Sequence, residues 1–333
     1  MTPSSPRETP APGEWRQGTE RAAAVPDNSG MDMHAGQLKV DVATVRELID
    51  QQFPQWRQLP VRAVPSQGTV NALFRLGERM VARLPLMPAN ALEIRSQLRM
   101  EAEAARQLAG RVRFPTPRPV AMGEPGAGYP LSWSVQTWLP GTAATPDDPA
   151  DSVGFAQDLA AFITDVRAID TGGRTFSGTG RGGNLLDHDA WMATCFEGGE
   201  GLLDVAPLRQ LWALLPELPP TPGGDVMTHG DLIPGNVLVA GGRLTGVIDV
   251  GGLGPADPAL DLVAAWHLLA PEPRRVFRAE LHVDDLQWAR GAAWALEQAM
   301  GAVRYYVDSN PAMSLMGRRT LQRIITDPPA VRA

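Results

Sequence analysis

The period of the apolar pattern changes near the middle of the chain, and this change limits the possible architectures. Before residue 138, short apolar segments are separated by Gly, Pro and polar turns, and residues 92–109 form the longest helical stripe. After residue 141, helical periodicity dominates and is interrupted by one hairpin over 236–249. Residues 138–141, Trp-Leu-Pro-Gly, break the pattern as a hinge would. The sequence therefore predicts a bilobal α+β protein.

The expected division is a tail over 1–37, an N-lobe over 38–138 and a C-lobe over 139–333. The tail is rich in Pro, Ser, Thr, Glu and Gly without periodicity, and we expect it to be disordered. In the N-lobe, Asp41 is expected to cap a first helix, and the predicted strands are 61–64, 70–76, 80–84 and 132–138. In the C-lobe, the predicted helices are 153–170, 189–195, 207–215, 260–270, 284–306 and 318–326.

Charge and cysteine content exclude several classes of protein. A formal net charge of −7 argues against a nucleic-acid or anionic membrane partner. Cys195 is the sole cysteine, so no intrachain disulfide is possible and the reducing cytoplasm is the expected location. No apolar run is long enough to span a bilayer, and we expect no membrane partner. Lys39 is the sole lysine and no Gly-Lys-Ser/Thr occurs, which excludes a P-loop.

Two further features look functional but are interpreted as structural. Residues 178–183 match the dinucleotide fingerprint Gly-x-Gly-x-x-Gly, yet no apolar strand precedes them, so a loop is expected. His188 and His267 have no partners at metal-ligand spacing. Both histidines are therefore expected to serve the fold.

The most informative residues surround the hairpin. Residues 229–236, His-Gly-Asp-Leu-Ile-Pro-Gly-Asn, precede it, and Asp249 follows it. If Gly241-Gly242 is a two-residue turn, Ala240 pairs with Arg243 and Asn236 lies opposite Val247, which puts Asp249 at the same open end as Asn236.

Three oxygen-bearing side chains therefore converge without any long-range assumption. Oxygens of Asn236 and Asp249 suit Mg²⁺, and Asp231 remains free to take a proton from an attacking hydroxyl. Taken singly, Asp231 and Asn236 are also residues that turns favour. Their combined spacing favours the functional interpretation.

Together with residues 254–262, this stretch resembles the aminoglycoside phosphotransferase family, in the protein-kinase-like group with choline kinases and macrolide phosphotransferases. The family pattern of His-Gly-Asp, Asn five residues after that Asp, then Ile-Asp and Asp-Pro-x-x-Asp is met at every position. The resemblance covers residues from about 41 to about 328. It implies a protein-kinase-like fold with a small antiparallel-sheet N-lobe and a larger, mainly helical C-lobe.

The resemblance also implies roles for individual residues. Asp231 would be the catalytic base, and His229 would support the catalytic loop. Asn236 and Asp249 would bind Mg²⁺. Asp261 would accept hydrogen bonds from the backbone of that loop. Asp257, before a proline, is interpreted as a helix N-cap.

The N-lobe provides an independent test of the resemblance. Glu101 lies on the apolar stripe of 92–109, where an unpaired carboxylate is costly and requires a cation. Arg83 shares a strand face with Val81 and is the expected partner, although most relatives carry Lys there. Arginine can bridge phosphate and carboxylate. The alternative is a surface Arg83, with Glu103 facing the cleft.

The remaining nucleotide contacts are expected in two places. Residues 66–71 contain Gly68, Thr69 and Asn71, and precede a strand, as a phosphate-covering loop would. Trp138 and Leu139 lie in the hinge and are expected to contact the nucleotide.

The implied activity is Mg²⁺-dependent transfer of the γ-phosphate of ATP or GTP to a hydroxyl of an antibiotic-like aminoglycoside or macrolide. A kinase for a sugar or amino alcohol is one alternative, and a nucleotide-binding pseudokinase is another, which an intact Asp231, Asn236 and Asp249 disfavours. Residues 184–231 hold eight acids, including Glu197 and Glu200, and one base. This charge predicts an acceptor that bears an amine, unless it serves solubility alone.

Overall fold

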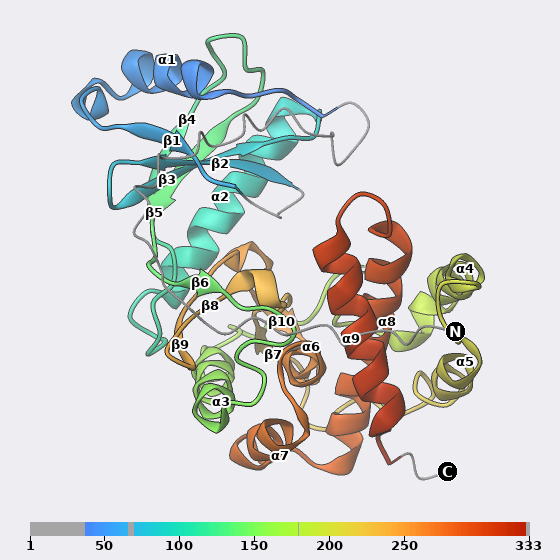
Figure 1. Cartoon of the computed structure of the whole chain (residues 1–333). Helices are drawn as coiled ribbons and strands as arrows, with labels where there is room; N and C mark the ends of the chain where they lie inside the picture. Colours follow the sequence, from blue (N-terminus) through green and yellow to red (C-terminus); the bar gives the residue numbers. More distant parts are fainter. Residues whose placement is uncertain (1–36, 66–69, 179, 331–333) are drawn as a thin grey trace, which may run out of the picture. The chain divides into compact units, whose positions relative to one another are not determined.

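The structure is a computed structural model that describes residues 37–65, 70–178 and 180–330 (Figure 1). Apart from Gln37, the predicted disordered tail lies outside the described residues. Over these ranges the chain combines antiparallel sheets with helices, so the predicted α+β class is confirmed. None of the helices in these ranges is long and apolar enough to cross a membrane.

The N-terminal part is built on a five-stranded sheet with strand order β1-β2-β3-β5-β4, in which every neighbouring pair is antiparallel. The β2–β3 hairpin turns at Gly77, whose φ of +58° is a left-handed conformation that glycine adopts without steric cost. The strands are β1 (Val61–Ala63), β2 (Asn71–Leu76), β3 (Met80–Pro85), β4 (Pro119–Gly123) and β5 (Trp133–Thr137).

Two helices accompany this sheet. The first, α1 (Val42–Gln52), begins where the Asp41 carboxylate accepts the Thr44 N–H at 2.8 Å, as predicted. Its buried residues pack with Phe74 and Trp133 in one apolar core. The second, α2 (Ala91–Leu108), buries Ala105 and Leu108 in the other, larger core of the chain. Ile94, on the same helix, packs against the first core, so α2 contacts both cores.

The C-terminal part is mainly helical, as predicted, and α8 and α9 run side by side through it (Figure 1). The predicted helix over 260–270 is a short 3₁₀ turn, η5 (Leu260–Val263), that continues into α6. The α-helices are α3 (Val153–Arg167), α4 (Asp189–Gly199), α5 (Ala206–Trp212), α6 (Ala264–Leu268), α7 (Pro271–Glu280), α8 (Asp285–Tyr305) and α9 (Pro311–Thr326).

Helix α7 was not predicted, and α9 begins seven residues before its predicted start at residue 318. Both helices have proline at their first position. Proline breaks a helix interior but is favoured at that position, where its missing N–H would have no helical partner. Pro271 and Pro311 therefore mark the starts of these two helices.

Short strands surround the predicted hairpin. Strand β7 (Val226–Thr228) pairs with β10 (Gly254–Ala256), and β8 (Val237–Ala240) lies between β6 (Thr142–Ala143) and β9 (Arg243–Val247).

Within the hairpin, the predicted pairing of Ala240 with Arg243 is confirmed. The predicted pairing of Asn236 with Val247 is wrong, because the register shifts between Leu238 and Val239. This bulge leaves one extra residue on β9, so Val247 pairs with Val237 and the Ile248 N–H donates to the Asn236 carbonyl at 2.9 Å. Asp249 still follows at the end of the hairpin that carries Asn236.

Candidate active site

The loop after β7 is held by a buried carboxylate. Asp261, on η5, is fully buried and accepts the backbone N–H groups of His229 at 2.8 Å and Gly230 at 2.9 Å. This is the contact that the resemblance implied for Asp261. Gly230 has a φ of +83°, which side-chain-bearing residues rarely adopt. The two hydrogen bonds fix the backbone at 229–230, and glycine at 230 permits the conformation that they require.

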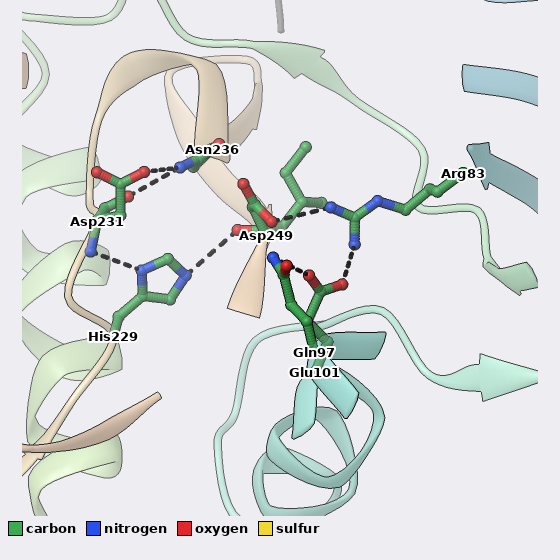
Figure 2. Close-up of polar contacts among 8 residues, drawn as sticks. Arg83, Gln97, Glu101, His229, Asp231, Asn236 and Asp249 are labelled. Atoms are coloured by element: carbon green, nitrogen blue, oxygen red, sulfur yellow. Dashed lines mark hydrogen bonds and ion pairs between the residues drawn. The ribbon is translucent and has the colours of Figure 1, made fainter. Parts of the chain in front are cut away.

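His229 ties this loop to the end of the hairpin. Its imidazole is buried, and its Nδ1 accepts the Asp231 N–H at 3.3 Å. The other ring nitrogen, Nε2, therefore carries the proton and donates to the Ile248 carbonyl at 3.2 Å. His229 thus connects the backbone on either side of the site, next to Asp231 and next to Asp249 (Figure 2).

Amide groups hold both oxygens of the Asp231 carboxylate. Asn236 Nδ2 donates to Oδ2 at 2.9 Å and also to the Asp231 carbonyl. Gln298 Nε2, from α8, donates to Oδ1 at 2.8 Å. The Arg181 guanidinium lies 3.5 Å from the same oxygen. The Asp231 side chain keeps 33% of its surface exposed, so a substrate can still reach it.

Asn236 and Asp249 present further oxygens beside Asp231 (Figure 2). Because Nδ2 of Asn236 is used by Asp231, its amide Oδ1 is the atom left for a cation. Asp249 adopts a left-handed conformation with φ of 58° and ψ of 53°, and its carboxylate is half exposed.

One amide oxygen and one carboxylate fit Mg²⁺, which takes few protein ligands and completes its shell with phosphate oxygens and water. The described residues contain no group of three or more His, Cys, Asp or Glu side chains that could hold a metal without such help.

A buried arginine joins the sheet to this site. Arg83, on β3, donates to Glu101 Oε2 at 3.2 Å and to Asp249 Oδ1 at 3.0 Å (Figure 2). The pairing with Glu101, predicted from the apolar stripe, is confirmed. Glu103 instead faces outward and pairs with Arg106 at 3.2 Å, so the alternative partner is wrong.

Gly251 allows the Glu101 side chain, on α2, to pack closely against the turn that contains residues after Asp249. A Cβ on Gly251, in the turn η4 (Val250–Gly252), would lie 2.6 Å from Glu101 Cγ, so only glycine allows α2 and η4 this close. Burial raises the pKa of Glu101, the Arg83 charge opposes this, and the Asp249 charge adds to it. Gln97 also donates to Glu101, at 3.4 Å.

The other predicted nucleotide contacts receive less support. Gly68 and Thr69 lie outside the described residues, and Asn71 begins β2 opposite Pro85. The Trp138 ring lies under the Arg75 guanidinium, 4.2 Å from ring centroid to Cζ. Leu139 packs against Gly246 of β9, and a Cβ added to Gly246 would lie 3.1 Å from Leu139 Cδ1. Nucleotide contacts of these residues stay a prediction.

A surface hollow lies beside Asp231, and we call it the α8 hollow. Its lining includes Arg181 and Gln298, the two residues that reach Asp231 Oδ1. Within it, His188 Nδ1 and Glu297 Oε1 lie 3.2 Å apart and both side chains are buried; their hydrogen bond raises the pKa of His188. The hollow is lined by Gly180, Arg181, His188, Trp191, Glu297, Gln298 and Gly301.

The acids singled out in the sequence do not line this hollow. Among the described residues that line the hollow, only Glu297 is acidic. Glu200 pairs with Arg209 at 3.1 Å, and Glu197 is exposed on α4. The N-cap interpretation of Asp257 is wrong, because the helical turn η5 begins at Leu260, with Ala259 at its N-cap and no side-chain cap. One oxygen does accept the Ala259 N–H at 2.9 Å, but the carboxylate is buried against Arg290, with the closest N–O distance 2.5 Å.

Comparison with known proteins places these features in a family. The model of the phosphotransferase enzyme family matches residues 61–296. An aminoglycoside 3'-phosphotransferase of Streptomyces fradiae is 32% identical over 198 residues, 55% of this chain and 64% of that protein. One of Salmonella typhimurium is 28% identical over 150 residues, 41% of this chain and 53% of that protein. The matched regions thus span between half and two thirds of these two relatives.

Solved structures show the same fold. The GDP complex of aminoglycoside 2'-phosphotransferase-IIIa superposes with a TM-score of 0.64 at 19% identity, over 86% of this chain and 99% of that one. Macrolide 2'-phosphotransferase type I superposes with a TM-score of 0.58 at 18% identity, over 84% and 95%. Since the family model matches well over half of its residues, the chain belongs to the phosphotransferase enzyme family.

Proposed function

We propose that this protein is a Mg²⁺-dependent kinase that transfers the γ-phosphate of ATP or GTP to a hydroxyl of an antibiotic-like small molecule in the cytoplasm. Residues 38–138 would form the nucleotide-binding lobe, and residues 139–333 the catalytic and acceptor-binding lobe. The observation that carries the proposal is the convergence of Asp231, Asn236 and Asp249 at one hairpin end, with Arg83 reaching Asp249 from the sheet.

In this proposal, Asp231 receives the proton of the acceptor hydroxyl. The acceptor oxygen then bonds to the γ-phosphorus as the bond to the β–γ bridging oxygen breaks and the nucleoside diphosphate leaves. Asn236 and Gln298 each donate to one carboxylate oxygen, which leaves the remaining lone pairs to orient that hydroxyl. Catalysis then depends mainly on positioning.

The phosphates would be held from two sides. When bound, Mg²⁺ would neutralise phosphate charge, with Asn236 Oδ1 and Asp249 as its protein ligands. Arg83 would contribute its guanidinium, kept in place by Glu101 at 3.2 Å. His229 and Asp261 would maintain the loop, and neither needs to touch the substrate.

The acceptor would occupy the α8 hollow, because two of its lining residues contact the proposed base. Relatives named aminoglycoside 3'-phosphotransferases and neighbours that include a macrolide phosphotransferase support an antibiotic-like acceptor. The direct experiment is a phosphate-transfer screen over aminoglycosides, macrolides, sugars and amino alcohols, each with ATP and with GTP. Transfer to sugars or amino alcohols alone would indicate a metabolite kinase. Nucleotide binding without any transfer would indicate a pseudokinase.

The Arg83–Glu101 pair is expected to behave as a unit in catalysis. Arg83→Ala and Glu101→Gln should each lower kcat/KM, and the double variant should lose little more than the worse single variant. Breaking an ion pair from either side removes the same contact. Steady-state kinetics of the four proteins provide the test, with Glu103→Gln as an exposed control. Losses that multiply would show that the pair does not act as a unit.

The acidic segment predicts an acceptor with at least one amine. Neutralising Glu197 and Glu200 together should raise its KM at low salt with little change in kcat, because exposed charges speed the encounter of a cation. The difference should fade as salt is added, since screening acts within about 8 Å at physiological ionic strength. Measured KM against ionic strength is decisive. An uncharged acceptor, or a KM independent of salt, would leave solubility as the role of these acids.

A further inference from the structure

Behind Asp231, a chain of hydrogen bonds runs into the helical core. Gln298, on α8, donates to Asp231 at 2.8 Å. The Gln298 Oε1 lies 3.0 Å from His267 Nε2, and His267 Nδ1 lies 2.8 Å from Thr320 Oγ1. His267 belongs to α6 and Thr320 to α9, and both side chains are fully buried. Three helices thus supply one chain that ends at the proposed base.

The direction of every bond in this chain follows from donor and acceptor chemistry. An ionised Asp231 can only accept, so Gln298 must present its amide nitrogen to it and its Oε1 to His267. His267 then carries its proton on Nε2, and its bare Nδ1 requires a donor. The Thr320 hydroxyl is that donor: it lies 2.8 Å from Nδ1, and the other acceptor within its reach, Met316 Sδ at 3.7 Å, is a weak one. The charge on Asp231 therefore sets the orientation of an amide, an imidazole tautomer and a buried hydroxyl.

The surroundings of His267 keep it in the neutral form that this chain needs. Burial lowers its pKa to about 4, and the charges of Arg181 and Arg323 act in the same direction, while the hydrogen bond to Gln298 opposes them. Arg323 also donates to the His267 carbonyl at 3.0 Å. At neutral pH the imidazole is thus an uncharged link between Thr320 and Gln298.

We propose that Thr320, His267 and Gln298 form a positioning chain that orients the Asp231 carboxylate toward the acceptor hydroxyl, an inference that rests on the proposed role of Asp231 as base. The loop side of the site holds Oδ2 through Asn236, and the chain holds Oδ1. Arg181 also forms an ion pair with Oδ1, at the longer distance of 3.5 Å. The chain gives Oδ1 its shorter contact, the neutral amide of Gln298 at 2.8 Å.

Thr320 provides the sharpest test, because it lies two links away from Asp231. Thr320→Val keeps the shape of the side chain but removes its hydroxyl donor. His267 must then either bury an Nδ1 without a hydrogen bond or move its proton to Nδ1, which would break its hydrogen bond to Gln298. We expect kcat to fall about tenfold or more, as small displacements of a catalytic group do, while the nucleotide KM stays within about twofold. Thr320→Ser should restore kcat. Thr326→Val makes the same substitution at an exposed position on the same helix and should have no effect.

A second measurement tests the hydrogen-bond chain without requiring phosphate transfer. Nitrogen-15 NMR of histidine-labelled protein, with His267 assigned by its loss in His267→Gln, should show the Nε2–H tautomer, still neutral at pH 5.5. Thr320→Val should alter that signal, and Thr326→Val should not.

The two measurements separate the possible failures. An Nδ1–H tautomer, or an unchanged kcat in a Thr320→Val protein that is folded and active, would overturn the positioning chain. A wild-type protein that transfers phosphate to nothing would instead reject the proposed function, whatever its tautomer.

Discussion

Asp231→Asn should lose phosphate transfer by about a hundredfold or more in kcat, which is the usual effect of removing a general base, while nucleotide affinity stays within about twofold. The amide cannot take the proton of the acceptor hydroxyl, and its Nδ2 would face one of the two amide donors, Asn236 or Gln298, that now hold the carboxylate. Arg83 and Asp249 would keep the contact that they make with each other. Chemistry should therefore be lost without binding.

Single-turnover phosphate transfer and nucleotide titration, measured on the same protein, test this separation. Asp308→Asn offers the matched control, because it makes the same change at an exposed residue between α8 and α9. Near-normal turnover in Asp231→Asn would rule out Asp231 as the base. Loss of nucleotide binding along with turnover would show that Asp231 supports the phosphate side of the site instead.

Local chemistry explains why this part of the site was predictable. Asp231, Asn236 and Asp249 lie within one loop and one hairpin, so a two-residue Gly-Gly turn is enough to bring them to the same end. The error in register had no consequence for this, since the bulge displaced Asn236 by one position and not to the other end of the hairpin. Arg83 and Glu101 were found because a buried carboxylate requires a cation.

The residues that the sequence did not reveal depend on helix packing over long separations. Gln298 is 67 positions from Asp231, and His267 is 53 from Thr320. Each has an ordinary local pattern, since a polar residue on a long helix usually faces solvent and a lone histidine usually serves the core. Arg181 lies in a glycine-rich loop without a periodic pattern. Only the packing of α6, α8 and α9 brings Gln298, His267 and Thr320 into one hydrogen-bonded chain that ends at Asp231.

Asp257 shows the same limit. Its position before a proline predicted a helix N-cap, but the helical turn begins three residues later, at Leu260, and the Asp257 carboxylate forms a buried ion pair with Arg290, 33 positions away. The sequence does not single out Arg290 as this partner. Arginine supplies nearly all of the positive charge in a chain with one lysine, so many arginines are equally plausible.

Asp249→Ala should abolish the Mg²⁺-dependent part of nucleotide binding. Asp249 is the charged member of the proposed ligand pair, and Asn236 alone offers a single neutral oxygen. A ligand at about 100 times its Kd stabilises the folded state by about 2.7 kcal/mol, so the wild type should unfold at a clearly higher temperature with nucleotide and Mg²⁺ than with nucleotide alone. In Asp249→Ala the two conditions should coincide. Asp308→Asn serves again as the control.

The apo protein supplies an independent check on the same variant, because Asp249 also raises the pKa of Glu101. A carboxyl whose pKa is higher in the folded state than in the unfolded chain stays protonated to a higher pH when folded. Stability therefore falls as the pH rises from about the unfolded-state pKa through the folded-state pKa. That window opens near 4.5, the ordinary value for Glu101. Removing the Asp249 charge should shrink this loss, and thermal unfolding between pH 4 and 7 would reveal it. If Asp249→Ala keeps its Mg²⁺ dependence yet shows the smaller pH loss, Asp249 is a partner of Arg83 and not a metal ligand; if both change, it has both roles.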